Sequence, residues 1–479
     1  MKLTDNLCTE RFFYYFKELS KIPRGSGNMK AVSNYCEDFA KSHGLEYIKD
    51  DACNIVIFKP ASVGFEKSKP VILQGHLDMV CQKTEECEID FEKDGIEIYE
   101  DGDFLKAKGT TLGADNGIAV AMILAVLEDE KLLHPAIEAV FTVDEEVGML
   151  GALKLDMSVL KADKMINLDS EEEGVITVSC AGGGDLCAVL PFENTKKQGT
   201  EITLTLKGLK GGHSGVEINS GRINADMLAG RILDAVGKKC DFDIISINGG
   251  DKSNAIPNKC TAKVCAYDAE EFCKYAKEYL EVVKDEIAFR EKEFCFDIAK
   301  GESGEFNAVD ENSAKKLLYA LVCSPCGVVE MSAEIEGLVE TSLNLGVLKT
   351  EKNRIFLQFS LRSNKSSALG FLTRRLEVFF SALNFECETS GYYPPWEFKD
   401  NSALQSIYSN VYEEFTGQKP EIAAIHAGLE CGVFSSALKG IECISVGPEM
   451  FDVHTTNEKL CISSAKRLFE ILKKVLEKL

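Results

Sequence analysis

Acidic and histidine side chains follow directly after short apolar runs at three points in this sequence. The positions are His76 and Asp78 after residues 71–74, Glu145 and Glu146 after residues 136–143, and Asp169 after residues 164–168. Such runs are typical of buried strands, and open α/β sheets place their sites where strands end. Because a buried cluster of acids needs a neutralising partner, and imidazole with carboxylate suits a divalent metal, the pattern predicts a metal site.

A fourth acid, Asp115, stands at the start of an apolar helix. It lies within Gly113-Ala114-Asp115-Asn116-Gly117, directly before the helix expected over residues 118–127. Taken alone, this aspartate is equally well explained as a helix cap. Because acids also follow the neighbouring strands, we favour the alternative explanation, in which Asp115 is part of the metal site.

Histidines are scarce and unevenly placed. Four of the six lie in glycine-bracketed loops at strand ends, namely His76, His213, His426 and His454. We set aside His43, at a helix end, and His134, before a proline. Each of the four also has a simpler explanation when taken singly, since polar residues end strands and surface loops hold histidines.

Local patterns predict the elements that position these residues. Two helices are expected within residues 3–43, the first capped by Thr4 and the second ended by Gly44. A surface hairpin is expected around residues 95–99, where apolar and polar residues alternate. Strands are expected at residues 54–58, 175–179, 202–206, 354–361, 423–425 and 441–446.

At 479 residues the chain is too long for one ordinary core, so two domains are expected. The pattern changes to β-rich segments and long helices near Gly174, and the α/β pattern returns after the turn-rich residues 392–396. We predict an α/β fold in which a central mixed sheet is flanked by helices and formed by residues 1–179 and 391–479. An inserted α+β domain, expected to act as a lid, comprises residues 180–390.

Composition excludes several classes of partner. The formal net charge of −23 argues against binding to nucleic acid or to anionic membranes, which need clusters of Lys and Arg. No apolar run approaches the roughly 20 residues that span a bilayer, and the first residues lack the core of a secretion signal. We therefore expect a cytoplasmic protein whose 18 cysteines are reduced thiols.

Several ordered motifs, spread over essentially the full length, resemble the dinuclear zinc metallopeptidases that include carboxypeptidase G, aminoacylase and the carnosinases. They are Gly75-His76-Leu77-Asp78, Gly113-Ala114-Asp115-Asn116-Gly117, Asp144-Glu145-Glu146-Val147-Gly148, Asn167-Leu168-Asp169, Gly212-His213-Ser214 and Asp452-Val453-His454. Within that group, further motifs are similar to the aminoacyl-histidine dipeptidases, also called Xaa-His dipeptidase or peptidase D. They are residues 109–117, Tyr393-Pro394, Trp396 and residues 426–432.

The resemblance implies two divalent ions, zinc first, with Co²⁺ or Mn²⁺ as alternatives. One ion is implied to be bound by His76, Asp115 and Asp169, and the other by Asp115, Glu146 and His454, with Asp115 bridging. A shared carboxylate can hold two ions about 3.5 Å apart. The Asp115-Asn116 peptide is implied to be cis.

Two further acids are implied to be catalytic. Asp78 would orient His76, and Glu145 would be the general base that takes a proton from a metal-bridging water. Adjacent strand residues point in opposite directions, so the chain must bend after Val143 if Glu145 and Glu146 are to share the site.

Four residues are implied or expected to bind the substrate. His213 would stabilise the oxyanion, Arg362 the substrate carboxylate and Glu430 the substrate ammonium, while His426 would line the site. As an isolated residue, Arg362 would more often be a surface charge.

The resemblance predicts a dipeptidase that acts on unblocked dipeptides, with Xaa-His and β-alanyl-histidine among them, and allows a homodimer. One alternative is an amidohydrolase or carboxypeptidase that acts on N-acylated amino acids. Another is an inactive metal-binding scaffold, which the intact Glu145 and the complete ligand set argue against.

Overall fold

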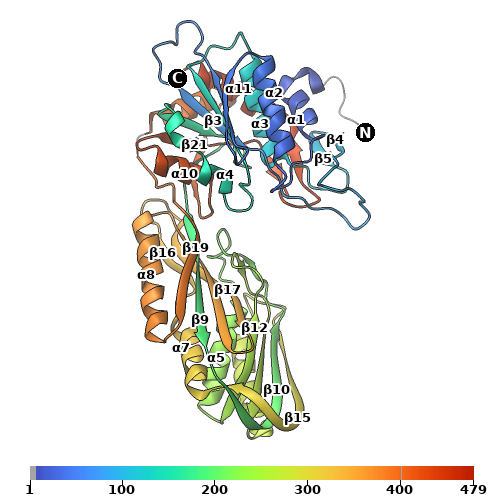
Figure 1. Cartoon of the computed structure of the whole chain (residues 1–479), viewed down its shortest axis with the longest axis vertical. Helices are drawn as coiled ribbons and strands as arrows, with labels where there is room; N and C mark the ends of the chain where they lie inside the picture. The colour runs from blue at the N-terminus through green and yellow to red at the C-terminus, as the bar shows by residue number, and fades with distance from the viewer. Residues whose placement is uncertain (1–6, 401) are drawn as a thin grey trace. The chain divides into compact units, whose positions relative to one another are not determined.

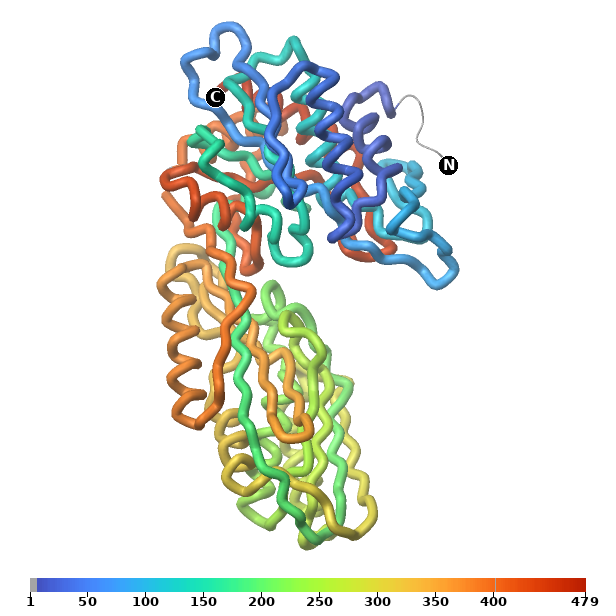
Figure 2. The backbone as a smooth tube through the Cα atoms, in the orientation of Figure 1, coloured from blue at the N-terminus to red at the C-terminus, as the bar shows by residue number. Residues whose placement is uncertain are grey.

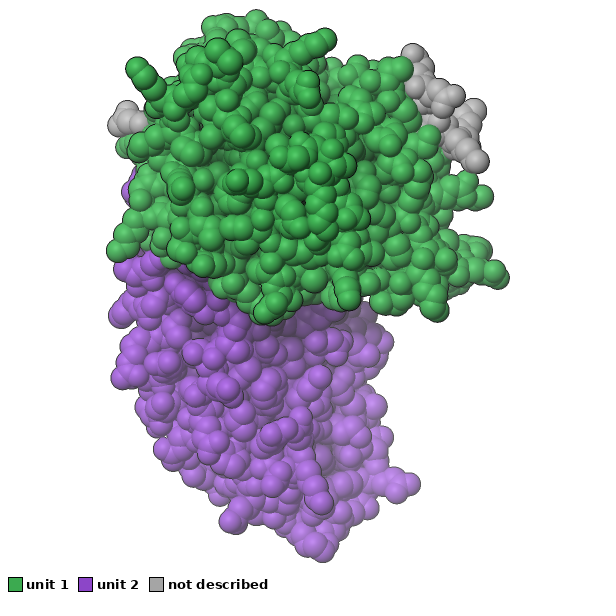
Figure 3. Space-filling model, turned by 45° about the horizontal axis from the view of Figure 1, so that its top comes forward, with its two compact units in different colours: residues 1–180, 396–424, 429–479 green, residues 181–395, 425–428 purple. Residues whose placement is uncertain are grey.

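The computed structural model describes residues 7–400 and 402–479, so the expected cap at Thr4 lies outside the described residues. The chain divides into two compact units, coloured separately in Figure 3. Unit 1 comprises residues 1–180, 396–424 and 429–479, and unit 2 comprises residues 181–395 and 425–428. Figure 2 shows that the first and last parts of the chain, blue and red, run through the same unit.

Unit 1 is built on a mixed eight-stranded sheet in the order β1-β2-β6-β3-β7-β21-β8-β20. The strands are Glu46–Lys49, Ile55–Lys59, Ile137–Thr142, Val71–His76, Lys164–Asn167, Glu442–Ser445, Val175–Cys180 and Glu421–Ile425 in that order. β6, β3, β7 and β21 are parallel neighbours, whereas β1 and β2 are antiparallel. The predicted mixed sheet is confirmed, and the carboxyl ends of its central strands meet at one edge.

Helices lie on both sides of this sheet (Figure 1). They are α1 (Arg11–Leu19), α2 (Lys30–Ser42), α3 (Ala114–Glu128), α4 (Leu150–Lys154), α9 (Ala403–Thr416), α10 (Glu430–Ala437) and α11 (Ile462–Leu476). α3 is buried almost all round because it is apolar on every face, and it packs against β3. A small sheet joins β4 (Ile98–Asp101), β5 (Phe104–Ala107), β22 (Met450–Phe451) and β23 (Lys459–Cys461).

Unit 2 has its own core and an antiparallel sheet in the order β15-β10-β14-β12-β17-β18-β9-β19, with β16 paired to β17. These strands are Cys295–Val309, Asn194–Lys207, Cys260–Ala266, Phe242–Gly249, Val339–Thr350, Arg354–Ser363, Gly182–Pro191, Glu386–Tyr393 and Gly327–Met331. Helices α5 (Ala225–Gly237), α6 (Ala269–Ile287), α7 (Glu311–Cys323) and α8 (Ser366–Ala382) contact its strands. A short pair, β11 (Gly212–His213) and β13 (Ala255–Ile256), carries His213.

Some local expectations are wrong in detail. The hairpin expected at residues 95–99 begins only at Ile98, because Gly95 is packed against the backbone of Lys21. Strand β1 escapes prediction because its four residues alternate in exposure without an apolar run. All 18 cysteines are free, and none of the helices in the described ranges is long and apolar enough to cross a membrane.

A buried acid in unit 2 gives the first testable prediction. Asp226, on the first turn of α5, is fully buried, and among the described residues no N–H or O–H group donates to its carboxylate, which lies beside the weakly polar thiol of Cys260. Burial raises the pKa of Asp226 from 3.8 to about 8. The unfolded chain therefore loses this proton near pH 4, while the folded chain keeps it to about pH 8, so stability falls as pH rises between these values.

Asp226→Asn removes this ionisation and should stabilise the protein at pH 7 by about 2–4 kcal/mol, since each unit of pKa shift is worth about 1.4 kcal/mol. Thermal melts of both proteins between pH 4 and pH 8 test this. The gain in Tm should be small at pH 4 and grow towards pH 8. If the difference in Tm between the two proteins stays constant from pH 4 to pH 8, Asp226 ionises at the same pH in the folded chain as in the unfolded chain, and the prediction is wrong.

Candidate metal centre

His76 ends the central strand β3, and only 1% of its side chain is exposed. The side chain of Asn116 packs closely against this strand at Gly75, where a Cβ atom would lie 2.4 Å from Oδ1 of Asn116. That oxygen accepts the backbone N–H of His76 at 3.1 Å, and the Asn116 amide donates to the carbonyl of Leu168 at 2.8 Å. Asn116 therefore ties the start of α3 to the ends of β3 and β7.

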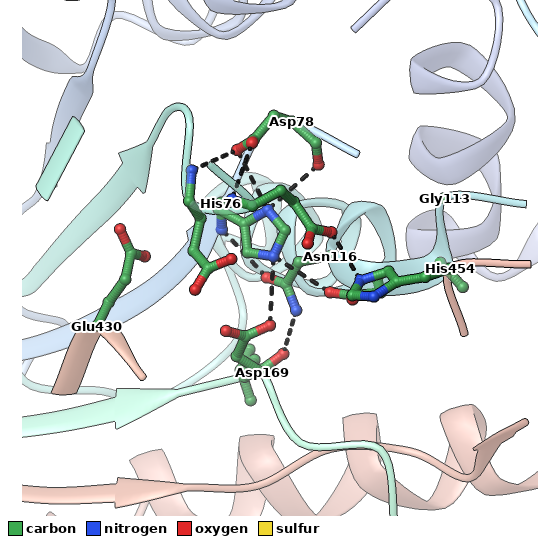
Figure 4. Close-up of polar contacts among 12 residues, drawn as sticks. His76, Asp78, Gly113, Asn116, Asp169, Glu430 and His454 are labelled. Atoms are coloured by element: carbon green, nitrogen blue, oxygen red, sulfur yellow. Dashed lines mark hydrogen bonds and ion pairs between the residues drawn. The ribbon is translucent and has the colours of Figure 1, made fainter. Parts of the chain in front are cut away.

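The carboxylate of Asp115 lies between two histidines. Its Oδ1 is 3.1 Å from Nε2 of His76, and its Oδ2 is 2.9 Å from Nε2 of His454. Asp169 lies 3.5 Å from the same His76 nitrogen, and Glu146 lies 3.0 Å from the same His454 nitrogen. Figure 4 shows the His76 ring between Asp78 and Asp169, with His454 beside them. The structure thus brings all five candidate ligand residues together, in two sets that share Asp115.

Local backbone geometry makes this convergence possible. The Asp115-Asn116 peptide is cis, which confirms the prediction. Asp144 has a φ of 54° and Gly148 a φ of 109°, so the chain bends after β6 as Glu145 and Glu146 require. His454 itself has a φ of 64°, a conformation that few residues other than glycine adopt.

Asp78 connects His76 to this bend. One oxygen, Oδ1, lies 3.3 Å from Nδ1 of His76 and accepts the backbone N–H of Glu145 at 3.1 Å. The other accepts the N–H of Glu146 at 3.2 Å and the hydroxyl of Ser26 at 2.9 Å. A fully buried carboxylate therefore fixes both the ring of His76 and the backbone of the two glutamates.

The electrostatics of this cluster suit a cation. Burial, together with the neighbouring Asp115 and Glu146, raises the pKa of Asp169 to about 6. Hydrogen bonds to Asp115 and Glu146 raise the pKa of His454 to about 11. Divalent ions would balance these carboxylates when bound. The ligand atoms of His76, Asp115 and Glu146 lie within 4.8 Å of one another, so the donor set fits a metal.

The predicted base Glu145 stands beside these groups. Burial, followed by the nearby Asp169, Glu430 and Glu146, raises the pKa of Glu145 well above its ordinary value. A bound cation would reverse this effect by favouring the carboxylate.

Three predicted substrate-binding residues belong to unit 2. Nδ1 of His213 accepts the backbone N–H groups of Gly215 and Val216, both at 3.2 Å, so the proton of the neutral ring is on Nε2. Burial, followed by the positive charge of Arg362, lowers the pKa of His213. His213 is thus a neutral hydrogen-bond donor.

Arg362 and His426 are both buried. Nη1 of Arg362 donates to the hydroxyl of Tyr393 at 2.8 Å, whereas its buried Nε has no hydrogen-bond partner among the described residues. His426 donates from Nδ1 to Asn364 at 3.1 Å and accepts from the hydroxyl of Ser342 at 2.7 Å. Burial, followed by Arg362, lowers the pKa of His426 to about 3, so its ring is neutral.

The fourth, Glu430, begins α10 in unit 1 and is fully buried. Its Oε2 accepts from the amide of Gln74 and from the hydroxyl of Thr142, the latter at 2.7 Å. Its Oε1 has no partner within the described ranges, and Figure 4 shows the side chain on the side of Asp169 away from His454. Burial raises the pKa of Glu430 to about 8.

Sequence reasoning missed two residues that contact this centre. Arg24 donates to the carbonyls of Leu77, Asp78 and Gly113, and Glu458 accepts the backbone N–H groups of residues 112–115. Each is a single charged residue in a polar stretch, with no flanking apolar run. The only available signal was the position of Glu458, four residues after His454.

A mixed sheet flanked by helices, with histidine and carboxylate side chains gathered at its strand ends, is an arrangement that metal-dependent hydrolases use. The chain belongs to peptidase family M20/M25/M40, whose family model matches residues 72–478.

Two similar proteins match over almost the whole chain. The cytosol non-specific dipeptidase of Escherichia coli (strain K12) is 37% identical over 483 residues, covering 100% of this chain and 99% of that protein. The crystal structure of the aminoacylhistidine dipeptidase from Vibrio alginolyticus has a TM-score of 0.87 and 36% identity, covering 98% of this chain and 96% of that one. A metallo-carboxypeptidase from Sulfolobus solfataricus, with 16% identity and a TM-score of 0.53 over 98% of both chains, shares the fold.

Proposed function

We propose that this protein is a metal-dependent dipeptidase that hydrolyses unblocked dipeptides, Xaa-His and β-alanyl-histidine among them. The observation that carries the proposal is the carboxylate of Asp115, whose two oxygens face His76 and His454 separately. A carboxylate placed in this way suits a bridge between two ions. The names of the Escherichia coli and Vibrio alginolyticus relatives support dipeptides as the substrates.

Two Zn²⁺ ions fit the donor set, and Co²⁺ or Mn²⁺ would fit similar ligands. His76, Asp169 and Asp115 would hold one ion, and His454, Glu146 and Asp115 the other, in keeping with the contacts described above. When bound, the ions supply Lewis acidity that polarises the scissile carbonyl and acidifies water.

The chain itself moves the proton. Glu145 accepts a proton from the attacking water on its carboxylate and delivers it to the leaving amine. Asp78 keeps Glu145 in place through the backbone N–H and holds the ring of His76. His213 donates from Nε2 to the oxyanion of the tetrahedral intermediate, a role that its fixed neutral form supports.

The two ends of the substrate are proposed to meet opposite charges. Arg362 binds the C-terminal carboxylate, and its unpartnered buried Nε is the observation that supports this role. Glu430 receives the ammonium group with its free Oε1, and the positive charge of that group favours the ionised form of this buried carboxyl, while His426 lines the site as a neutral ring.

The cellular location and the assembly of the enzyme are also proposals. We place it in the cytoplasm, in line with the word cytosol in the name of the Escherichia coli relative. The homodimer and the action of the inserted domain as a lid stay predictions from the resemblance.

The competing function is an amidohydrolase. It would accept N-acylated amino acids, which lack the ammonium that Glu430 would bind.

The purified chain should bind two divalent ions, because five side chains converge in two sets and one zinc needs only three or four ligands. A chelator should abolish dipeptide hydrolysis and added Zn²⁺ should restore it. His454→Ala should lower the metal content from two ions per chain to one by elemental analysis, while His43→Ala, at the end of α2, should leave it unchanged. A single ion in a fully active wild-type chain would contradict the dinuclear site.

A further inference from the structure

Glu458 is a buried carboxylate, 3% exposed, that accepts four consecutive backbone N–H groups. Oε2 accepts from Leu112 at 2.7 Å and Gly113 at 3.0 Å, while Oε1 accepts from Ala114 at 2.8 Å and Asp115 at 3.4 Å. Buried N–H groups are costly without an acceptor, and charged acceptors form the stronger hydrogen bonds. The side chain of Glu458 therefore stabilises the conformation of the loop that carries Asp115.

Arg24 holds the same loop through a carbonyl group. Its guanidinium, 2% exposed, donates from Nη2 to the carbonyl of Gly113 at 2.5 Å and from Nη1 to those of Leu77 and Asp78 at 3.1 and 3.2 Å. Gly113 has a φ of 64°, and a Cβ atom there would lie 2.5 Å from Nη2 of Arg24. Arg24 thus links the Asp115 loop to the segment that follows His76.

Glu458 and His454 belong to one short turn. The N–H of Thr455 donates to the carbonyl of Asp452, and the N–H of Glu458 donates to the carbonyl of Thr455, both at 3.2 Å. Directly afterwards, β23 pairs with β5 and anchors the turn. The segment that presents His454 to Oδ2 of Asp115 therefore also binds the backbone of Asp115.

We propose that Glu458, with Arg24 as its counterpart, is a positioning residue that fixes the Asp115 carboxylate between His76 and His454 and so sets the affinity for metal. The inference rests on the metal site proposed above and deepens it. Residues that orient metal ligands typically contribute 10- to 100-fold to metal affinity.

Glu458→Gln tests this. Each carboxylate oxygen accepts two N–H groups, and the amide nitrogen that replaces one oxygen cannot accept a hydrogen bond, so two N–H groups lose their acceptor. Zn²⁺ affinity is measured by competition with a chelator, and the visible spectrum of the Co²⁺-loaded protein reports ligand geometry. We expect Zn²⁺ affinity to fall about 10- to 100-fold and the Co²⁺ spectrum to change. Two matched controls, Glu138→Gln and Glu291→Gln, alter buried carboxylates that accept backbone N–H groups away from the site. Both should lower stability without changing either readout.

Wild-type Zn²⁺ affinity and an unchanged Co²⁺ spectrum in Glu458→Gln would overturn the inference, even if its Tm falls. If that variant does not fold, Arg24→Lys is tested by the same two measurements. A lysine keeps the charge but lacks the planar guanidinium that donates to several carbonyls, so the same loss of Zn²⁺ affinity and change in the Co²⁺ spectrum are expected. A wild-type chain that binds no Zn²⁺ would overturn the metal site itself, and the inference with it.

Discussion

Glu145→Gln should lower kcat for dipeptide hydrolysis by about 10²- to 10⁴-fold, the usual contribution of a general base. The amide keeps the shape of the side chain but cannot accept a proton. Because the backbone of Glu145 is held by Asp78, and the substitution leaves all five candidate ligands intact, metal content should stay at the wild-type value. Steady-state kinetics on a dipeptide and elemental analysis of the same sample measure both quantities.

The matched control is Glu138→Gln, near the start of β6, the strand whose opposite end precedes Glu145. Glu138 accepts the N–H groups of Lys161 and Ala162 and has no contact with the candidate ligands, so kcat should stay close to wild type. A Glu145→Gln enzyme within a few-fold of wild type would show that another group is the base. A variant that has lost metal would show that Glu145 is a ligand.

Much of the site could be predicted because its residues follow apolar strands. β3, β6 and β7 are fully or largely buried, so each appears in the sequence as a short apolar run, and His76, Glu145 and Asp169 stand at or just beyond their ends. Parallel strands bring such ends together, which makes the convergence of distant residues a consequence of topology. Asp115 and His454 are singled out as candidates by the acid pattern and by the loop histidines, but their assignment to the two ions comes from the resemblance, since neither follows a strand of that sheet.

The remaining contacts could not be predicted because they join charged side chains to backbone groups far away in sequence. Glu458 binds N–H groups about 345 positions earlier, and Arg24 binds carbonyls of two separate segments. A backbone acceptor or donor leaves no mark on residue type. A lone glutamate or arginine in a polar stretch therefore looks like a surface charge until the fold is known.

In unit 2 the limits of prediction have a different cause. The strands β10 and β15 are 14 and 15 residues long, yet the apolar pattern predicted only residues 202–206 of β10. Residues 194–200 of β10 pair with residues 303–309 of β15. Most of these side chains are exposed or half-buried, so polar residues predominate there. Backbone hydrogen bonds along the ladder hold these strands without an apolar pattern.

Arg362 offers the test that separates a dipeptidase from an amidohydrolase. Arg362→Ala should lower kcat/KM for free dipeptides by about 10²- to 10³-fold, since losing a charged, bidentate partner costs about 3–4 kcal/mol. Arg362→Lys should lose about 10-fold, because a lysine keeps the charge without the planar fork. Arg354→Ala, at the exposed start of the same strand β18, should leave kcat/KM unchanged.

Blocked substrates show which end of the substrate Arg362 binds. A dipeptide whose C-terminus is an amide should be a poor substrate of the wild type, and Arg362→Ala should make it little worse, because the carboxylate proposed to bind Arg362 is already absent. N-acetyl amino acids should also be poor substrates, since they lack the ammonium proposed to meet Glu430. Binding at both ends would limit the substrate to about one peptide bond between its two charges, and the same contacts would place its scissile carbonyl. If N-acetyl amino acids or C-terminal amides are hydrolysed as fast as free dipeptides, recognition of both ends is wrong and the amidohydrolase takes its place.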